Sequence, residues 1–270
     1  MASSRKPGSL CLTHGALGID DGTLSLTCSP TPGPLWQTYL QTEAMAMFAR
    51  QEAMEAIQRL FDSCLNPEVS LSAADFQAAA DKLDVEVELI RAVASVESPR
   101  GPFDENGHPT ILFERHYFHK LTQGKYDKTH PAISNAVAGG YGKFRAQYGK
   151  LEEAYNLDPS AALQSASWGK FQIMGRNYQA AGFASVEDMV AAMMKSEKNQ
   201  LDAFVSFVKS DSKLLGALKK KSWADFARGY NGAGYAKNEY DTKLKTAYEN
   251  ELKNKTRTTN PIPNSVAGTK

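Results

Sequence analysis

Helical spacing of apolar residues is the feature that most constrains the fold of this chain. Between residues 185 and 210, apolar side chains recur every three or four positions, which is the period of one helix face. They are Val186, Met189, Val190, Met193, Met194, Leu201, Phe204, Val205 and Val208. The pattern predicts one long helix over 185–210. Other helices are predicted over 46–64, 72–83, 85–97, 212–220, 222–229 and 238–254, so we expect a mainly α protein.

One stretch departs from the helical pattern, directly after the predicted helix 85–97. Turn-forming residues occur from Gly101 to Pro109, and β-branched and aromatic residues follow over 110–118. This composition predicts a small extended or β insert in an otherwise helical domain. Residues 122–150 read as loop, and Gly139-Gly140-Tyr141-Gly142 in it is predicted to be a flexible cleft edge.

The chain divides unevenly. Residues 1–44 are rich in Gly, Pro, Ser and Thr without a period and are predicted to be a flexible leader, which need not be translated because Met45 stands where the helical pattern begins. We expect one helical domain over 45–254 and a disordered tail over 255–270. Within the domain, Ser72 and Asp75 predict a capping box at the start of one helix, and Asp84 ends that helix.

Charge and composition exclude several classes of function. The net charge of +1 gives no broad basic field for nucleic acid, and no apolar run approaches the ~20 residues of a membrane helix. The three cysteines are odd in number and lack metal-ligand spacing. We therefore expect no nucleic-acid partner, no stable membrane insertion, no metal and no cofactor.

Glu97 is the most informative residue for chemistry. It continues the apolar stripe of Ile90, Val93 and Ala94, at the point where Pro99 stops the helix. An acid on an apolar face is poorly solvated, so its pKa is expected to rise. A carboxyl group that stays protonated near neutral pH is what a general acid for glycosidic-bond cleavage requires.

Three short motifs occur in order: Glu97-Ser98, Ser167-Trp-Gly-Lys-Phe-Gln-Ile-Met174 and Arg228-Gly-Tyr-Asn-Gly232. In this order they resemble the lysozyme-like superfamily of goose-type lysozymes and lytic transglycosylases. Together with Leu-Phe-Glu-Arg-His over 112–116, they are similar to the N-acetylmuramidase domain of bacteriophage endolysins. The resemblance covers about two-thirds of the chain. It implies a lysozyme-like helical domain whose small extended insert follows the catalytic helix.

The resemblance also implies a substrate and roles for the motif residues. The substrate is the glycan strand of peptidoglycan, cut at the β-1,4 bond between N-acetylmuramic acid and N-acetylglucosamine. Glu97 would be the general acid. Ser98, Gln172, Tyr230 and Asn231 are predicted to bind substrate, with the Tyr230 hydroxyl aimed at the Glu97 carboxyl.

The second catalytic group is less determined by sequence. Both hydrolytic mechanisms ordinarily use a second carboxylate. We favour Glu114, which on a strand shares a face with His116 but not with His119, over Asp104 and Glu105. This alternation also argues against a metal site.

Several alternatives stay open on the sequence. Lytic transglycosylases need no second acid and leave 1,6-anhydro products, and a glycan-binding module would keep the cleft without turnover. A secreted toxin could carry the same domain as a phage lysis protein. If the chain is a phage lysis protein, we expect a monomer that stays in the host cytoplasm. A holin would then release it to the cell wall in the periplasm.

Overall fold

The computed structural model describes residues 65–97 and 101–259, together with scattered helical positions between Thr42 and Phe61. The predicted leader over 1–44, apart from Thr42 and Ala44, lies outside the described residues, as do Ser98 and residues 260–270. The elements described below belong to the unit that spans Phe48–Lys270.

The first complete helices form as local sequence signals predict. α2 (Ala73–Leu83) begins at a capping box in which Ser72 accepts from the Asp75 amide and the Asp75 carboxylate accepts from the Ser72 amide. It ends at Asp84, whose φ of 53° is left-handed. α3 (Val87–Glu97) follows and carries Glu97 at its last position.

The described residues form a three-stranded antiparallel sheet in the order β1-β2-β3, to which the predicted insert contributes one strand. Only β1 (Ile111–Phe113) belongs to the predicted extended arm. β2 (Ala166–Trp168) and β3 (Ile173–Met174) come from the second motif and were not predicted, because strands this short show no alternation. The register places Ile111 opposite Trp168.

The predicted arm over 110–118 is wrong beyond Phe113. Glu114 has extended backbone and stands at the N-cap of α4 (Arg115–Leu121), so His116 is helical. The argument that Glu114 and His116 share a strand face therefore fails.

The predicted single helix over 185–210 is also wrong, since two helices share its apolar stripe. α7 (Val186–Lys195) ends at Ser196, which is extended, and α8 (Glu197–Ser210) starts there with the Ser196 side chain as its cap. Glu68 pairs with this break: its amide donates to Lys195 at 3.0 Å and its carbonyl accepts from Glu197 at 2.9 Å. A contact between distant segments thus splits the helix.

The remaining elements are α5 (Gln147–Leu157), α6 (Pro159–Gln164), α9 (Ser212–Lys219), α10 (Trp223–Asn231), α11 (Tyr240–Thr259) and the 3-10 turns η1 (Phe144–Ala146), η2 (Gly175–Asn177) and η3 (Ala233–Asn238). The helices predicted over 212–220 and 222–229 are confirmed. α11 runs past the predicted end at 254, and Lys255 Nζ lies 2.8 Å from Glu88 Oε1 on α3. Residues 255–259 of the predicted tail are thus helical.

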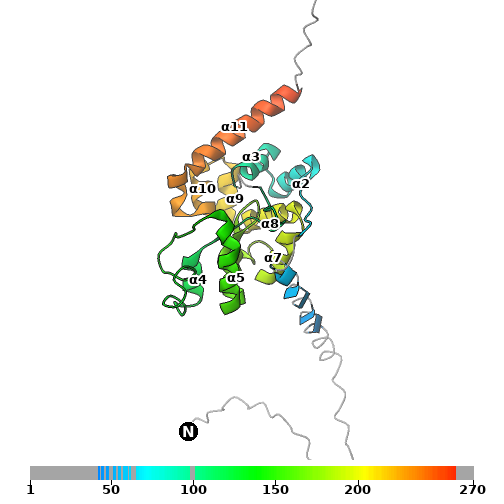
Figure 1. The fold of residues 1–270 in the computed structure, drawn as a ribbon. Helices are drawn as coiled ribbons and strands as arrows, with labels where there is room; N and C mark the ends of the chain where they lie inside the picture. The colour runs from blue at the N-terminus through cyan, green and yellow to red at the C-terminus, as the bar shows by residue number, and fades with distance from the viewer. Residues whose placement is uncertain are drawn as a thin grey trace, which may run out of the picture. The chain divides into compact units, whose positions relative to one another are not determined.

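Helix α3 packs against α2 and α11 (Figure 1). Its core face is Leu89, Ile90, Ala92, Val93 and Ala94, all buried. Aromatic side chains fill the space around the sheet and α8, and the largest fully buried ones are Trp168, Phe113, Phe118, Phe171, Phe204 and Phe226. The mainly α class is confirmed, and no helix within the described ranges is long and apolar enough to cross a membrane.

The capping box gives a test of the fold. We expect Ser72→Ala to lower the free energy of unfolding by about 1 kcal/mol, because the first turn of α2 loses the acceptor for the Asp75 amide. Chemical denaturation measures the change. Ser212→Ala, at an exposed first position of α9, is the control and should change stability little.

Candidate active site

The carboxyl group of Glu97 is removed from water at the end of α3. The residue as a whole is half-buried, but its Oε1 is buried and has no hydrogen-bond partner among the described residues. Desolvation by burial raises the pKa of Glu97 well above its ordinary value of 4.5. The predicted poor solvation of this acid is confirmed.

Tyr230 lies on α10, near enough to Glu97 for the charge of that residue to affect its pKa. Its ring stacks on Phe226 at 5.6 Å and meets Phe204 edge-on at 5.8 Å. Burial raises the pKa of Tyr230 well above 10.0, and the charge of Glu97 raises it further. The hydroxyl donates to the Phe171 carbonyl at 2.6 Å, so the expectation that it is aimed at the Glu97 carboxyl is wrong.

The three sequence motifs meet through these contacts. Glu97 comes from the first, the Phe171 carbonyl from the second and Tyr230 from the third. They converge because Tyr230 on α10 bonds to the turn between β2 and β3 and lies within the influence of the Glu97 charge at the end of α3. The sequence order alone could not supply this arrangement.

Gln172 holds that turn together. Its φ is 47°, its amide nitrogen donates to the carbonyls of Gly169 at 2.8 Å and Thr110 at 3.1 Å, and its amide oxygen accepts from the Ser167 hydroxyl at 2.7 Å. These bonds tie β2 and β3 to the start of β1. The side chain thus has a structural role, and its predicted contact with sugar stays a prediction.

Gln200 is a residue of the site that the sequence reasoning missed. It is fully buried on α8, where its amide oxygen accepts from the Lys170 amide at 2.7 Å and its nitrogen donates to the Met193 carbonyl at 3.0 Å. Gly169 has a φ of 70°, and a Cβ there would lie 2.5 Å from the Gln200 side chain. A polar residue in line with Phe204 and Val208 on an apolar stripe was the available signal.

Glu114 is a second carboxyl group with a raised pKa. Its Oε1 accepts from the Tyr141 hydroxyl at 3.1 Å, and its Oε2 lies 3.1 Å from His116 Nδ1 without the angle of a hydrogen bond. Burial is the largest cause and raises the pKa of Glu114, while Tyr141 and His116 partly offset it. His119 pairs instead with Asp127 at 2.8 Å.

The glycine-rich segment 139–142 is fastened beside Glu114. Lys150 Nζ donates to the carbonyls of Gly140 at 2.6 Å and Tyr141 at 2.9 Å. Gly140 has a φ of 69°, which favours glycine, and a Cβ there would lie 2.7 Å from the Arg115 guanidinium, which would have to move. Tyr141, which the sequence reasoning did not select, has its pKa raised to about 12 by burial and by the charge of Glu114.

The other sequence candidates lie elsewhere or outside the described ranges. Ser98 is outside them, and Asn231 is exposed at the end of α10. Asp104 accepts from the amides of Asn106 and His108 within its own turn, and Glu105 pairs with Arg145 at 3.2 Å on the surface. In the described part of the chain, no group of three or more His, Cys, Asp or Glu side chains is placed to hold a metal ion.

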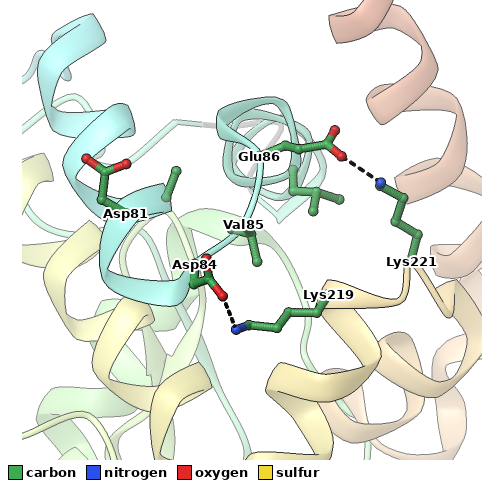
Figure 2. Close-up of a pocket in the computed structure, with 8 residues that line it drawn as sticks. Asp81, Asp84, Val85, Glu86, Lys219 and Lys221 are labelled. Atoms are coloured by element: carbon green, nitrogen blue, oxygen red, sulfur yellow. Dashed lines mark hydrogen bonds and ion pairs between the residues drawn. The ribbon is translucent and has the colours of Figure 1, made fainter.

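A cavity of about 490 Å³ lies between the α2–α3 junction and the end of α9, and Glu97 does not line it (Figure 2). Lys219 pairs with Asp84 at 2.8 Å and Lys221 with Glu86 at 2.7 Å across it. Because its lysines are already matched with carboxylates, this cavity offers no unpaired cation to a ligand, and Glu97 remains the centre of the candidate site.

A helical bundle with a buried acid at a helix end, beside a small sheet, is the arrangement expected of lysozyme-like enzymes. The N-acetylmuramidase family model matches residues 86–251, which include Glu97, Glu114, Gln172 and Tyr230. The chain therefore belongs to the N-acetylmuramidase family.

A solved structure supports the same fold. The chain is 42% identical to the Burkholderia AP3 phage endolysin in its crystal structure, over 70% of this chain and 73% of that chain, with a TM-score of 0.65. No curated protein matches. The predicted lysozyme-like helical fold is confirmed.

The raised pKa of Glu97 makes a prediction about stability. Because the folded protein binds this proton more tightly than the unfolded chain, stability is lost as pH rises from 4.5 through the raised pKa. Glu97→Gln removes this titration. We expect the variant to match the parent at about pH 4 and to unfold at a higher temperature at about pH 8, as measured by thermal denaturation. If the gap in unfolding temperature between parent and variant is the same at about pH 4 and at about pH 8, the carboxyl is not buried as described.

Proposed function

We propose that the protein is a peptidoglycan-degrading endolysin that cleaves the β-1,4 bond between N-acetylmuramic acid and N-acetylglucosamine, with Glu97 as the general acid. The observation that carries the proposal is the buried Glu97 carboxyl, which has no partner for Oε1 among the described residues. Family membership and the likeness to a phage endolysin agree with it.

The chemistry follows from the protonation state of Glu97. With its pKa raised by burial, the carboxyl keeps its proton near neutral pH and donates it to the glycosidic oxygen as the bond breaks. The carboxylate that remains then takes a proton from the water that attacks the sugar. Tyr230, fixed by its hydrogen bond to the Phe171 carbonyl, is the neighbour whose own pKa responds to the charge of Glu97.

Glu114 is our proposal for the second carboxyl group. It is partly buried, and Tyr141 holds one of its oxygens while the other has no hydrogen bond. By contrast, Asp104 is bound to the amides of its own turn, and Glu105 is paired with Arg145 on the surface. Glu114 would position the attacking water or stabilise the positive charge that develops on the sugar.

Ser98, Gln172 and Asn231 complete the proposed substrate contacts. As a phage endolysin, the protein would be a monomer that collects in the host cytoplasm, needs a holin for release, and acts on the wall in the periplasm. The likeness to the AP3 phage endolysin supports this route.

Mass spectrometry of the released muropeptides tests the reaction class. Reducing sugar ends are expected from hydrolysis. Anhydro ends would instead assign the chain to the transglycosylase reaction, and binding to the wall without release would assign a glycan-binding role.

The role of Glu97 predicts a large loss of activity without loss of fold. We expect Glu97→Gln to reduce lysis in a zymogram or turbidity assay by about 10³-fold, because the amide cannot give a proton to the leaving oxygen. Glu152→Gln, an exposed change on α5, is the control and should keep full activity. A Glu97→Gln protein that clears the wall normally would rule out the proposed acid.

The role of Glu114 predicts a smaller but clear loss. We expect Glu114→Gln to lower kcat by at least about tenfold, because the charge beside the reacting sugar is removed. Glu105→Gln serves as the matched control, since Glu105 pairs only with Arg145 on the surface. If the Glu114 variant keeps full rate, the second acid lies elsewhere.

A further inference from the structure

A cavity of about 400 Å³ lies beside α3, lined by residues of α2, α3 and α11 and by Lys170. Its wall includes Arg91 and Glu251, which carry opposite charges. Lys170 is already paired with Glu197 at 2.8 Å. The cavity therefore presents one available cation and one available anion.

Arg91 and Glu251 have no hydrogen bond or ion pair with any residue in the described ranges, and they do not pair with each other. The Arg91 guanidinium lies 5.5 Å from the Phe76 ring centre, and its Nε is buried without an acceptor. A buried donor without an acceptor is uncommon and calls for an explanation. A ligand that carries both charges would supply partners for both side chains.

The cavity borders the helix that carries the proposed catalytic group, although the Arg91 side chain leaves that helix about 120° around the axis from Glu97. Arg91 precedes Glu97 by six residues on the same helix, which corresponds to about 9 Å along the axis. Ala94 and Ser95, between them, also line the cavity. On its other side Lys170 directly precedes Phe171, whose carbonyl binds Tyr230.

We propose that this cavity binds the peptide stem of peptidoglycan, with Arg91 on a carboxylate and Glu251 on an ammonium group. The proposal rests on the proposed function, because the stem peptide is attached to the muramic acid whose glycosidic bond would be cut. The glycan strand itself offers hydroxyl and amide groups, whereas the stem carries carboxylates and a free amine. Arg is suited to a carboxylate, which it binds through two parallel hydrogen bonds.

A binding experiment tests the cavity without turnover. The full chain is titrated by calorimetry with a soluble stem tetrapeptide that contains diaminopimelate. We expect Arg91→Gln and Glu251→Gln each to weaken binding about tenfold, or ~1.4 kcal/mol. The controls Lys209→Gln and Glu152→Gln remove exposed charges of the same signs and should change nothing. Acetylating the side-chain amine of the diaminopimelate should weaken binding to the parent but not to Glu251→Gln.

A turnover experiment places the subsite in the reaction. Arg91→Gln should lower kcat/KM about tenfold on intact peptidoglycan and leave it unchanged on glycan strands stripped of peptide by an amidase. Circular dichroism checks the fold, and Arg91→Lys, which keeps the charge but not the paired hydrogen bonds, should fall between parent and Arg91→Gln.

The outcomes separate the two proposals. Equal loss on both substrates, or no peptide binding by a parent protein that clears the wall, would overturn the stem subsite and leave the muramidase proposal standing. Peptide binding that depends on Arg91, in a parent that cuts neither substrate, would support the subsite and remove the proposed function.

Discussion

Removal of water from the Glu97 carboxyl is the constraint on which the rest of the site depends. The core face of α3 is buried as far as Ala94, and Glu97 follows in the last turn, where its charge raises the pKa of Tyr230. An acid in this position keeps its proton only while its surroundings stay apolar. Tyr230, which is related to Glu97 electrostatically, packs in turn on Phe226 and Phe204, and Phe204 stacks on Phe171.

Several buried polar atoms are left without a hydrogen bond. Among the described residues they are Glu97 Oε1, Glu114 Oε2, His116 Nδ1, Arg91 Nε, Glu88 Oε2 and the Tyr240 hydroxyl. The first four lie at the proposed catalytic groups or at the cavity beside α3, whereas Glu88 and Tyr240 belong to neither place. Leaving a buried polar atom unpaired costs stability, and at the first four positions the proposed substrate would supply partners.

Glu114 was selected from the sequence for a reason that the structure does not support. Its selection rested on a strand argument that fails, since α4 begins at the next residue. It nevertheless lies beside His116, because the two side chains meet at the first turn of that helix. Tyr141, which bonds to Glu114 from a distant loop, gave only a weak signal as an aromatic residue among glycines.

By itself the sequence determined the features that depend on neighbouring residues. These include the capping box at Ser72, the end of α2 at Asp84 and the position of Glu97 on an apolar stripe, because caps and periodicity act over one or two turns. Only the tertiary structure decided the break between α7 and α8, the pairing of β1 with β2 and the bond from Tyr230 to Phe171. Each of these joins segments far apart in the chain, and its energy depends on packing that no local pattern records.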